Sequence, residues 1–302
     1  MLGFSNWVAW RQSNYYFQAA NAFVFVFCLL AIPATLFFAF DPSARAAETD
    51  QAVPDFSGYW VRPEPGPARI FYQPESGPGP IVFAEDAGEM RQGIPMMGDH
   101  TNPILLPHTA AAVKAQADRF RAGEFIWPAW SLCFHSGVPL VLNMAEPVQF
   151  LQTKDQITII YQRGQQVRRI DLNKAHPQNP APQWYGHSVG HYEGPHTLVV
   201  DTIAQDTRSV VDRFGTPKSP AMRIVERYTV SADGQRLDVD FAVEDSNMFT
   251  TAWSSKVAYE KIPPRTDDGP MEPPFAEIIC PENNRNPSGG DFPSPFDDTP
   301  DF

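Results

Sequence analysis

Apolar and polar side chains alternate with a period of two residues along most of the chain after position 147. In RLDVDFAVED, residues 236–245, every second side chain is apolar: Leu237, Val239, Phe241 and Val243. Successive side chains of a β-strand point to opposite faces, whereas a helix repeats its apolar positions every three or four residues. Each such segment therefore predicts a β-strand with one buried face and one face in water.

The strand patterns follow one another closely, with turn residues between them. A first short strand is expected in DFSGYWV, residues 55–61. The later strands are expected in VQFLQT, QITIIYQ, QVRRIDLN, GHSVGHYE, TLVVDT, RIVERYTV, RLDVDFAVED and AWSSKVAYEKI. Asp233 and Gly234 form a strong hairpin signal, and the lack of intervening helices argues against βαβ units. We predict an all-β fold, an antiparallel up-and-down barrel of lipocalin-like kind.

The region before these strands is different in composition. Residues 62–107 are rich in proline and glycine, which predicts an irregular wrap over the surface. One helix is expected in TAAAVKAQADRFRAG, residues 109–123, with Thr109 as its cap and Gly123 as its stop. We expect this helix to cover one end of the barrel.

The N-terminal segment predicts export. Residues 22–40, AFVFVFCLLAIPATLFFAF, are apolar and uncharged, and Ala44 and Ala46 follow in the arrangement that signal peptidase recognises. Residues 1–46 are therefore interpreted as a signal peptide of a periplasmic or secreted protein. The apolar run is also close to the length that spans a bilayer, so an inner-membrane anchor is the alternative.

The rest of the chain is expected to contain one domain. Residues 47–54 are interpreted as a flexible leader, 55–280 as a single barrel domain and 281–302 as a disordered, acidic tail. After cleavage two cysteines would remain, Cys133 and Cys280. An even number of cysteines in an oxidising compartment predicts a disulfide, and two separate buried thiols are the alternative.

Charge and missing motifs exclude several classes of function. The formal net charge of −12 repels phosphate backbones, so nucleic acid is not an expected partner. The sequence has neither a Walker A motif nor a G-x-G-x-x-G that opens a helix, and no cofactor is expected. GHSVG around Ser188 resembles the nucleophile elbow of hydrolases, but that motif requires a turn into a helix and here a strand pattern continues.

Four segments carry a resemblance to a known group of proteins. DFSGYW, RRIDL, GHSVGHYEG with TLVVDT, and ERYTVSADGQRLDVDFAVED resemble a family of exported bacterial proteins of undefined function, over residues 55–261. The chain departs from that pattern in a longer EGPHT turn, in Tyr192 where tryptophan is usual, and in RRIDLNKAHP. The resemblance supplies no catalytic residue. The triplet Gly58-x-Trp60 also resembles the G-x-W signature of lipocalins.

The segment WYGHSVGHYEG raises the question of a histidine site. On a strand, Tyr185, His187, Val189, His191 and Glu193 share one face. The Cα atoms of the two histidines are then about 13 Å apart, too far for both imidazoles to bind one zinc ion. No metal site is predicted, although the pair of His191 and Glu193 with a third ligand is an open alternative.

Acid–base chemistry requires only one well-placed histidine, because its side chain titrates near neutral pH. We name His187 as the candidate, with Asp201 or Glu226 to orient it if it points into the barrel. Arg169 would hold an anionic or carbonyl-bearing substrate. The expected reaction is that of a lyase, isomerase or hydratase and needs no cofactor.

Binding without chemistry is the leading hypothesis. The barrel would hold a small apolar or aromatic molecule and reach the membrane only through its N-terminal segment. The ligand-binding candidates are Arg168, His191, Glu193, Tyr228 and Trp253. A structural or envelope-interaction protein that uses the irregular N-terminal region is the third hypothesis. For the site itself, the alternative is that His187 and His191 only face solvent or cap hydrogen bonds in the core.

Overall fold

A computed structural model describes residues 53–63, 71–87, 96–124 and 133–263. The predicted signal segment, most of the leader, the acidic tail and Cys280 lie outside the described residues. Within these ranges, no helix combines the length and the apolar character needed to cross a bilayer.

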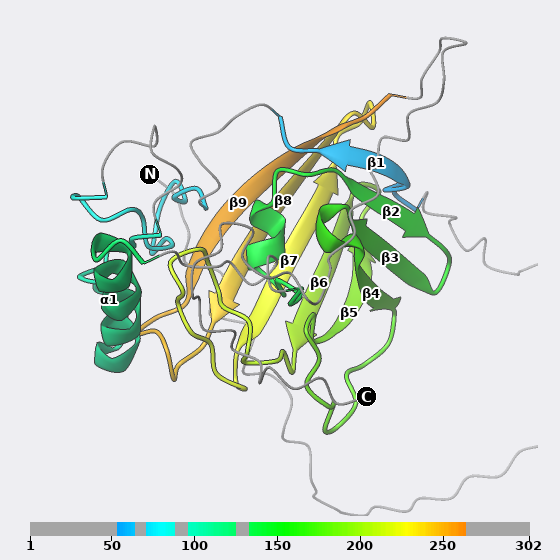
Figure 1. Ribbon diagram of the computed structural model, residues 1–302. Coiled ribbons are helices and arrows are strands. Elements are labelled where there is room, and N and C mark those ends of the chain that lie inside the picture. The colour runs from blue at the N-terminus through cyan, green and yellow to red at the C-terminus, as the bar shows by residue number, and fades with distance from the viewer. Residues whose placement is uncertain (1–52, 64–70, 88–95, 125–132, 264–302) are drawn as a thin grey trace, which may run out of the picture. The chain divides into compact units, whose positions relative to one another are not determined.

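The strands that the structure describes close into a barrel in which neighbours in sequence are neighbours in space (Figure 1). The closure is made by β1, which pairs with both β2 and β9. The strands are β1 Gly58–Val61, β2 Val148–Gln152, β3 Gln156–Tyr161, β4 Gln166–Leu172, β5 His187–Glu193, β6 Thr197–Ile203, β7 Arg223–Val230, β8 Arg236–Glu244 and β9 Trp253–Lys261. Each lies within a segment that predicted a strand, except that β6 extends one residue beyond TLVVDT, to Ile203, and the predicted barrel is confirmed.

One strand pair departs from the predicted up-and-down topology. β4 and β5 run parallel, with Ile170 opposite Ser188 and Leu172 opposite Gly190. Parallel neighbours need a connection that returns to the starting end of the strand, and residues 173–186 provide it. The sheet is therefore mixed, and the lipocalin-like up-and-down arrangement is not confirmed.

The pairing of β4 with β5 begins only at Ile170, so the first half of β4 has no ladder partner on that side among the described residues. On its other side β4 is paired with β3 along its whole length. The wall of the barrel therefore opens between the beginnings of β4 and β5.

Large side chains occupy much of the barrel interior. The alternation of buried and more exposed residues along the strands places one face of each inside. Trp60, Phe150 and Tyr228 are the largest aromatic residues among the fully buried strand residues. Gly190 faces the same way and lies where a Cβ would be 3.0 Å from Ile170 Cγ2, so its side of β5 packs closely against aliphatic neighbours.

The helix α1 spans Pro107–Arg121, two residues earlier at each end than predicted. Thr109 is not its cap: Leu106 takes that position, and Thr109 is buried within the first turn. Pro107 is a suitable first residue because its fixed φ matches the helix and its missing N–H would have no helical partner there. The helix ends before Gly123, as predicted, and Gly123 takes the left-handed conformation that follows many helices, with φ of +81°.

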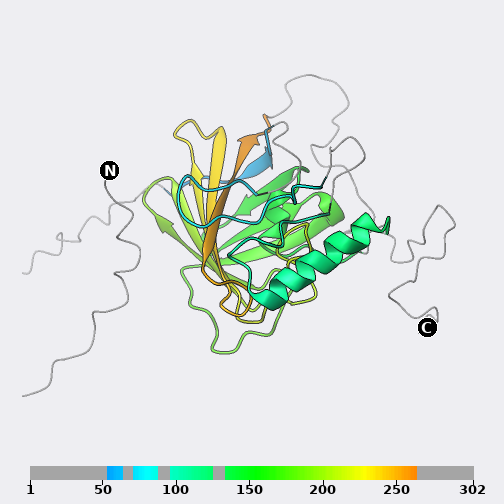
Figure 2. The ribbon, with the colours of Figure 1, turned by 90° about the vertical axis from the view of Figure 1, so that its left-hand side faces the viewer.

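α1 lies to the left of the barrel in Figure 1 and in front of it in Figure 2. Its side chains make hydrogen bonds to the connections that follow β6 and β8. The amide of Gln116 donates to the carbonyl of Arg213 at 3.0 Å, and the backbone N–H of Leu106 donates to Met248 at 3.1 Å. Two short 3-10 turns complete the described helices, η4 Leu140–Asn143 and η5 Arg163–Gln165.

Candidate functional site

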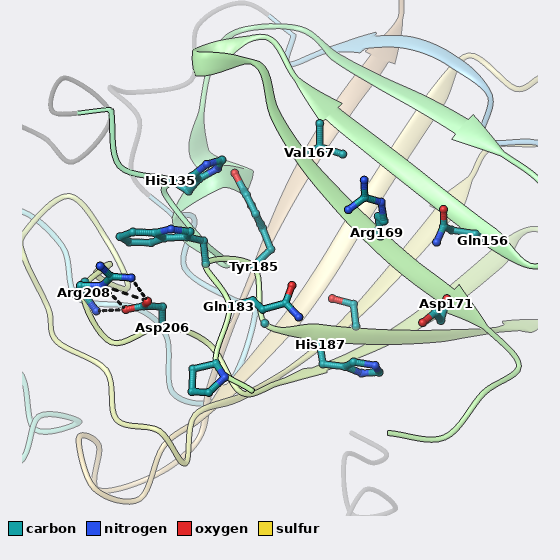
Figure 3. A pocket seen from close by; sticks show the side chains of 14 residues that line it. His135, Gln156, Val167, Arg169, Asp171, Gln183, Tyr185, His187, Asp206 and Arg208 are labelled. Atoms are coloured by element: carbon teal, nitrogen blue, oxygen red, sulfur yellow. Dashed lines mark hydrogen bonds and ion pairs between the residues drawn. The ribbon is translucent and has the colours of Figure 1, made fainter. Parts of the chain in front are cut away.

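A pocket of about 490 Å³ lies where β4 and β5 separate (Figure 3). It is lined by residues of β3 and β4, by the segment 182–188, and by His135, Asp206 and Arg208. Its volume is within the usual range for small-molecule sites. The site is therefore in the wall of the barrel, at the parallel pair.

The local conformation before β5 explains the opening. Gly186 has φ of +67°, and a Cβ there would lie 2.4 Å from the carbonyl oxygen of Ile203. Glycine permits both the left-handed conformation and this close approach to β6. Tyr185 then turns inward, stacks on Tyr161 with a centroid distance of 5.7 Å, and donates to the side-chain oxygen of Gln166. The chain thus reaches the sheet beside β4 only from β5 onward.

Aromatic rings form another part of the pocket lining. Tyr185 and Trp184 both line the pocket, and the ring of Phe134 stacks on Trp184 at 5.4 Å. The guanidinium of Arg208 lies 4.5 Å from the centroid of Trp184. The ring of His135 is 6.0 Å from the same ring, and its Nδ1 is a buried atom with no hydrogen-bond partner among the described residues. Burial lowers the pKa of His135, which favours its neutral, weakly hydrated form.

The acidic residues of the pocket have basic partners, whereas one of its arginines has no acidic partner in the described part of the chain. Asp206 accepts three hydrogen bonds from the Arg208 side chain, at 2.6 to 3.1 Å, and these lower the pKa of the Asp206 carboxyl. Asp171 accepts from Lys174 at 2.9 Å. Arg169 is exposed and, within the described ranges, makes no hydrogen bond or ion pair through its guanidinium. Arg169 is therefore the available cation of the pocket.

His187 is the first residue of β5 and faces outward, because its neighbour Ser188 faces the interior. Its Nδ1 lies 2.9 Å from Nδ1 of His176, a residue of the connection between β4 and β5. On the other side of His176, Nε2 is 3.7 Å from a carboxylate oxygen of Asp201. Arg223 holds that carboxylate with two hydrogen bonds of 2.9 Å. Four polar side chains thus follow one another from the pocket outward: His187, His176, Asp201 and Arg223.

A buried ion pair lies on the other face of the same wall. The side chains of Arg168 and Glu226 are both fully buried and paired through two hydrogen bonds. Burial is the largest single effect and acts to lower the pKa of Arg168, but the charge and hydrogen bonds of Glu226, together with Tyr228 and Tyr161, raise it by more, so the net direction is upward. Ser188, which also lines the pocket, accepts from Nη2 of Arg168 at 3.2 Å. Ser188 therefore connects the pocket wall with this interior pair.

The structure brings some of the predicted catalytic residues together and separates others. His187 and Arg169 line one pocket, and Asp201 is reached from His187 through His176. Glu226 is in the interior, so it does not share a face with His187. The condition under which Glu226 would orient His187, that His187 points into the barrel, is therefore not met.

The predicted ligand-binding residues fall in three places. Arg168 and Tyr228 belong to the interior cluster, where Tyr228 Oη donates to Glu226 at 2.7 Å. His191 and Glu193 are exposed at the end of β5, and Glu193 accepts from Arg227 at 2.8 Å. None of these lines the pocket between β4 and β5.

Trp253 is buried in the core, with its ring 6.1 Å from those of Phe71 and Phe241. Trp253 therefore belongs to the apolar core and does not line the pocket. Cys133 is described but Cys280 is not, and their disulfide stays a prediction.

Sequence patterns did not identify several residues of the site. His176, Trp184, Asp206 and Arg208 lie in irregular connections, where no periodicity relates a residue to a face. Within the part of the chain that the structure describes, no three His, Cys, Asp or Glu side chains gather in a way that could hold a metal ion.

Comparison with known proteins adds no relative. A scan against protein-family models finds no match for this chain. A search of curated proteins likewise finds no match. The resemblance to exported bacterial proteins stays a prediction from the four motifs.

Proposed function

We propose that this barrel protein binds a small organic anion, with a flat apolar or aromatic part, in the pocket between β4 and β5. Exported location, in the periplasm or outside the cell, is part of the proposal and comes from the N-terminal sequence. The ligand class combines the small aromatic molecule expected from the sequence with the charge of the pocket.

The observation that carries the proposal is that Arg169, in a pocket partly lined by aromatic rings, has no ion-pair partner among the described residues. A guanidinium binds a carboxylate through two parallel N–H bonds, and such charge-assisted bonds are stronger than neutral ones. Trp184 and Tyr185 supply apolar surface for a ring, while Asp171 and Asp206 already have basic partners. An anion at Arg169 therefore does not have to displace an existing ion pair of the arginine.

The test is a binding series with matched charged and neutral probes. Benzoate and 2-naphthoate are compared with benzamide and 2-naphthamide by calorimetry and by thermal shift, since a ligand of the folded state raises the melting temperature with its concentration. We expect the carboxylates to bind and the amides to bind more weakly. Arg169→Gln should weaken carboxylate binding roughly 10- to 100-fold, because hydrogen bonds to charged groups contribute about 1.5–3 kcal/mol.

Arg236→Gln is the matched control, since Arg236 is also a strand arginine but pairs with Asp238 on the surface. Equal affinity for benzoate and benzamide, or an Arg169→Gln variant that behaves like this control, would contradict the proposal. Absence of binding by every probe would favour a structural role in the cell envelope.

A second function, a cofactor-free lyase, isomerase or hydratase, is favoured by the groups behind His187. A histidine beside a cationic pocket can remove a proton from a carbon next to a carboxylate or carbonyl group, and positioned general bases contribute about 10²–10⁴-fold. The assay is hydrogen–deuterium exchange of the bound carboxylates in D₂O, followed by proton NMR, with phenylacetate included because it has acidic C–H bonds. The wild type should catalyse exchange, and His187→Gln should bind without catalysing it. Equal exchange by both would exclude His187 as the base.

A further inference from the structure

We infer that His176 is a positioning residue that holds His187 in the tautomer with a proton on Nδ1, which leaves the Nε2 lone pair as the base of the pocket. This inference deepens the proposed acid–base function and assigns a role to a residue of the irregular connection between β4 and β5.

The first step is the contact between the two rings. Nδ1 of His176 and Nδ1 of His187 are 2.9 Å apart, a hydrogen-bond distance. A neutral imidazole carries one proton on one of its two nitrogens, so one ring donates across this contact and the other accepts. The direction of donation decides which nitrogen of His187 is free.

The second step is the environment of the other nitrogen of His176. Its Nε2 is buried, has no hydrogen-bond partner among the described residues, and lies 3.7 Å from Oδ2 of Asp201. That distance is too long for a hydrogen bond but short for an electrostatic interaction in a partly buried place. A proton on Nε2 faces the carboxylate favourably, whereas a lone pair there would face negative charge.

The third step follows from tautomer chemistry. If Nε2 of His176 carries the proton, its Nδ1 must accept. His187 then donates from Nδ1, and its Nε2 is the unprotonated nitrogen. His187 lines the pocket, so this lone pair is the one left for a ligand. The arrangement is that of a base oriented by a second group and a carboxylate, as in triads.

The charges around His176 support a neutral ring at ordinary pH. The groups that act on it are Asp201, His187 and Arg223. Burial is the largest effect and lowers the pKa of His176; Asp201 acts to raise it, and His187 and Arg223 act to lower it. Arg223 pairs with Asp201 through two hydrogen bonds, so the carboxylate is held in place, and its effect on His176 remains larger than the opposing effect of Arg223.

Proton transfer to this base balances without a cofactor. A C–H or O–H bond of the ligand breaks, its electron pair stays on the ligand as an enolate or alkoxide, and the proton forms a bond to Nε2 of His187. The imidazolium keeps its Nδ1–H bond to His176 and returns the Nε2 proton to another ligand atom. Arg169 in the same pocket is suited to hold a carboxylate during this step.

The experiment reads the tautomer directly. Long-range ¹H–¹⁵N correlation spectra of the ligand-free protein, at a pH where His187 is neutral, distinguish the protonated from the unprotonated ring nitrogen. We expect His187 to be protonated on Nδ1 in the wild type. In His176→Leu, which lacks the acceptor, we expect the Nε2–H form to become the major one. His176→Asn offers a side-chain oxygen as acceptor and should retain more of the Nδ1–H form.

His191→Ala is the control, because this exposed histidine on the same strand face makes its own contact with Glu193. It should leave the spectrum of His187 unchanged. An Nε2–H tautomer of His187 in the wild type would overturn the inference without need of any variant. So would a tautomer that is unchanged in both His176 variants.

The tautomer result and the activity result can fail separately. If His187 has the expected tautomer and no carboxylate exchanges hydrogen, the acid–base function fails while the role of His176 in setting the tautomer stands. If exchange is catalysed, His176→Leu should reduce the exchange rate, but by less than the approximately 10²–10⁴-fold loss expected for His187→Gln. It should also shift the pH profile of the exchange rate.

Discussion

Replacing Glu226 with glutamine is expected to destabilise the protein by about 3 kcal/mol, more than almost any surface change. Glu226 is fully buried and is the acidic partner of Arg168 inside the barrel. The guanidinium also donates to hydroxyl oxygens, to Tyr228 at 3.3 Å, to Ser188 at 3.2 Å and to Thr202 at 2.8 Å. Only Glu226 in this cluster supplies a compensating negative charge.

The size of the effect follows from what the variant leaves behind. Glutamine has nearly the same shape, so it creates no cavity, but it leaves the Arg168 charge buried and places an amide donor where a carboxylate oxygen accepted. Breaking a buried ion pair by removing one partner costs about 3–5 kcal/mol. The three hydroxyl acceptors remain and offset part of the loss, which favours the low end of that range. At about 2–4 °C per kcal/mol, the melting temperature should fall by about 6–12 °C.

The assay is denaturant unfolding at neutral pH, with Asp238→Asn as the control. Asp238 pairs with Arg236 on the surface, with both side chains about half exposed, so its loss should change stability by at most about 1 kcal/mol. The double variant Arg168→Met with Glu226→Leu should recover most of the lost stability, because it leaves no buried charge. A Glu226→Gln variant as stable as the control, or a double variant no better than the single one, would refute the reasoning.

Two further predictions concern residues away from the ion pair. Gly190→Ala should destabilise the protein by about 1–3 kcal/mol through overpacking, because a Cβ would lie 3.0 Å from Ile170 Cγ2 and 3.1 Å from Leu198 Cδ1. A free energy of unfolding within about 0.5 kcal/mol of the wild type would contradict this prediction and show that β5 can shift. Lys218 is buried and desolvation lowers the pKa of its amine from 10.5 to about 7. Because the unfolded chain keeps this proton to a higher pH, the free energy of unfolding should rise between about pH 7 and 10, by up to about 1.4 kcal/mol per pH unit. The same unfolding experiment across this pH range should show no such rise for Lys218→Met.

The strands were predictable because their period is set by local geometry. In β8, one apolar residue at every second position is sufficient to define the strand and its buried face. The direction of a strand leaves no such trace, since alternation is the same when it is read from either end. The parallel pairing of β4 with β5 was therefore not predicted, although the length of the connection 173–186 permits it.

The start of α1 shows a different limit. Thr109 is a common capping residue, but Pro107 is an even better first helical residue and extends the helix toward the N-terminus. Both signals were present in the sequence. Just before the helix, Leu105 forms an isolated antiparallel bridge with Phe249 and both side chains are in the core, a long-range constraint that no local signal reveals.

The candidate site was predicted in part for the same reason. His187 and Arg169 lie on regular strands, where outward orientation follows from the inward orientation of Ser188 and Arg168. Their partners do not lie on strands. His176 is eleven residues before His187 in the chain, and no periodic pattern indicates that its ring meets that of His187.

The pocket and the departure from up-and-down topology have one cause. A strand that ran antiparallel to β4 could follow it through a short turn and could pair along its full length. The parallel β5 instead requires the long connection 173–186, which contributes His176 and the pocket residues Trp184 and Tyr185, and it pairs only from Ile170 onward. The opening in the wall, its aromatic lining and the second histidine thus arise together, from the reversal of a single strand. A protein with the same strand sequences and a short antiparallel connection at this place would keep the core, including the pair of Arg168 and Glu226, but would have neither this pocket nor a partner for His187.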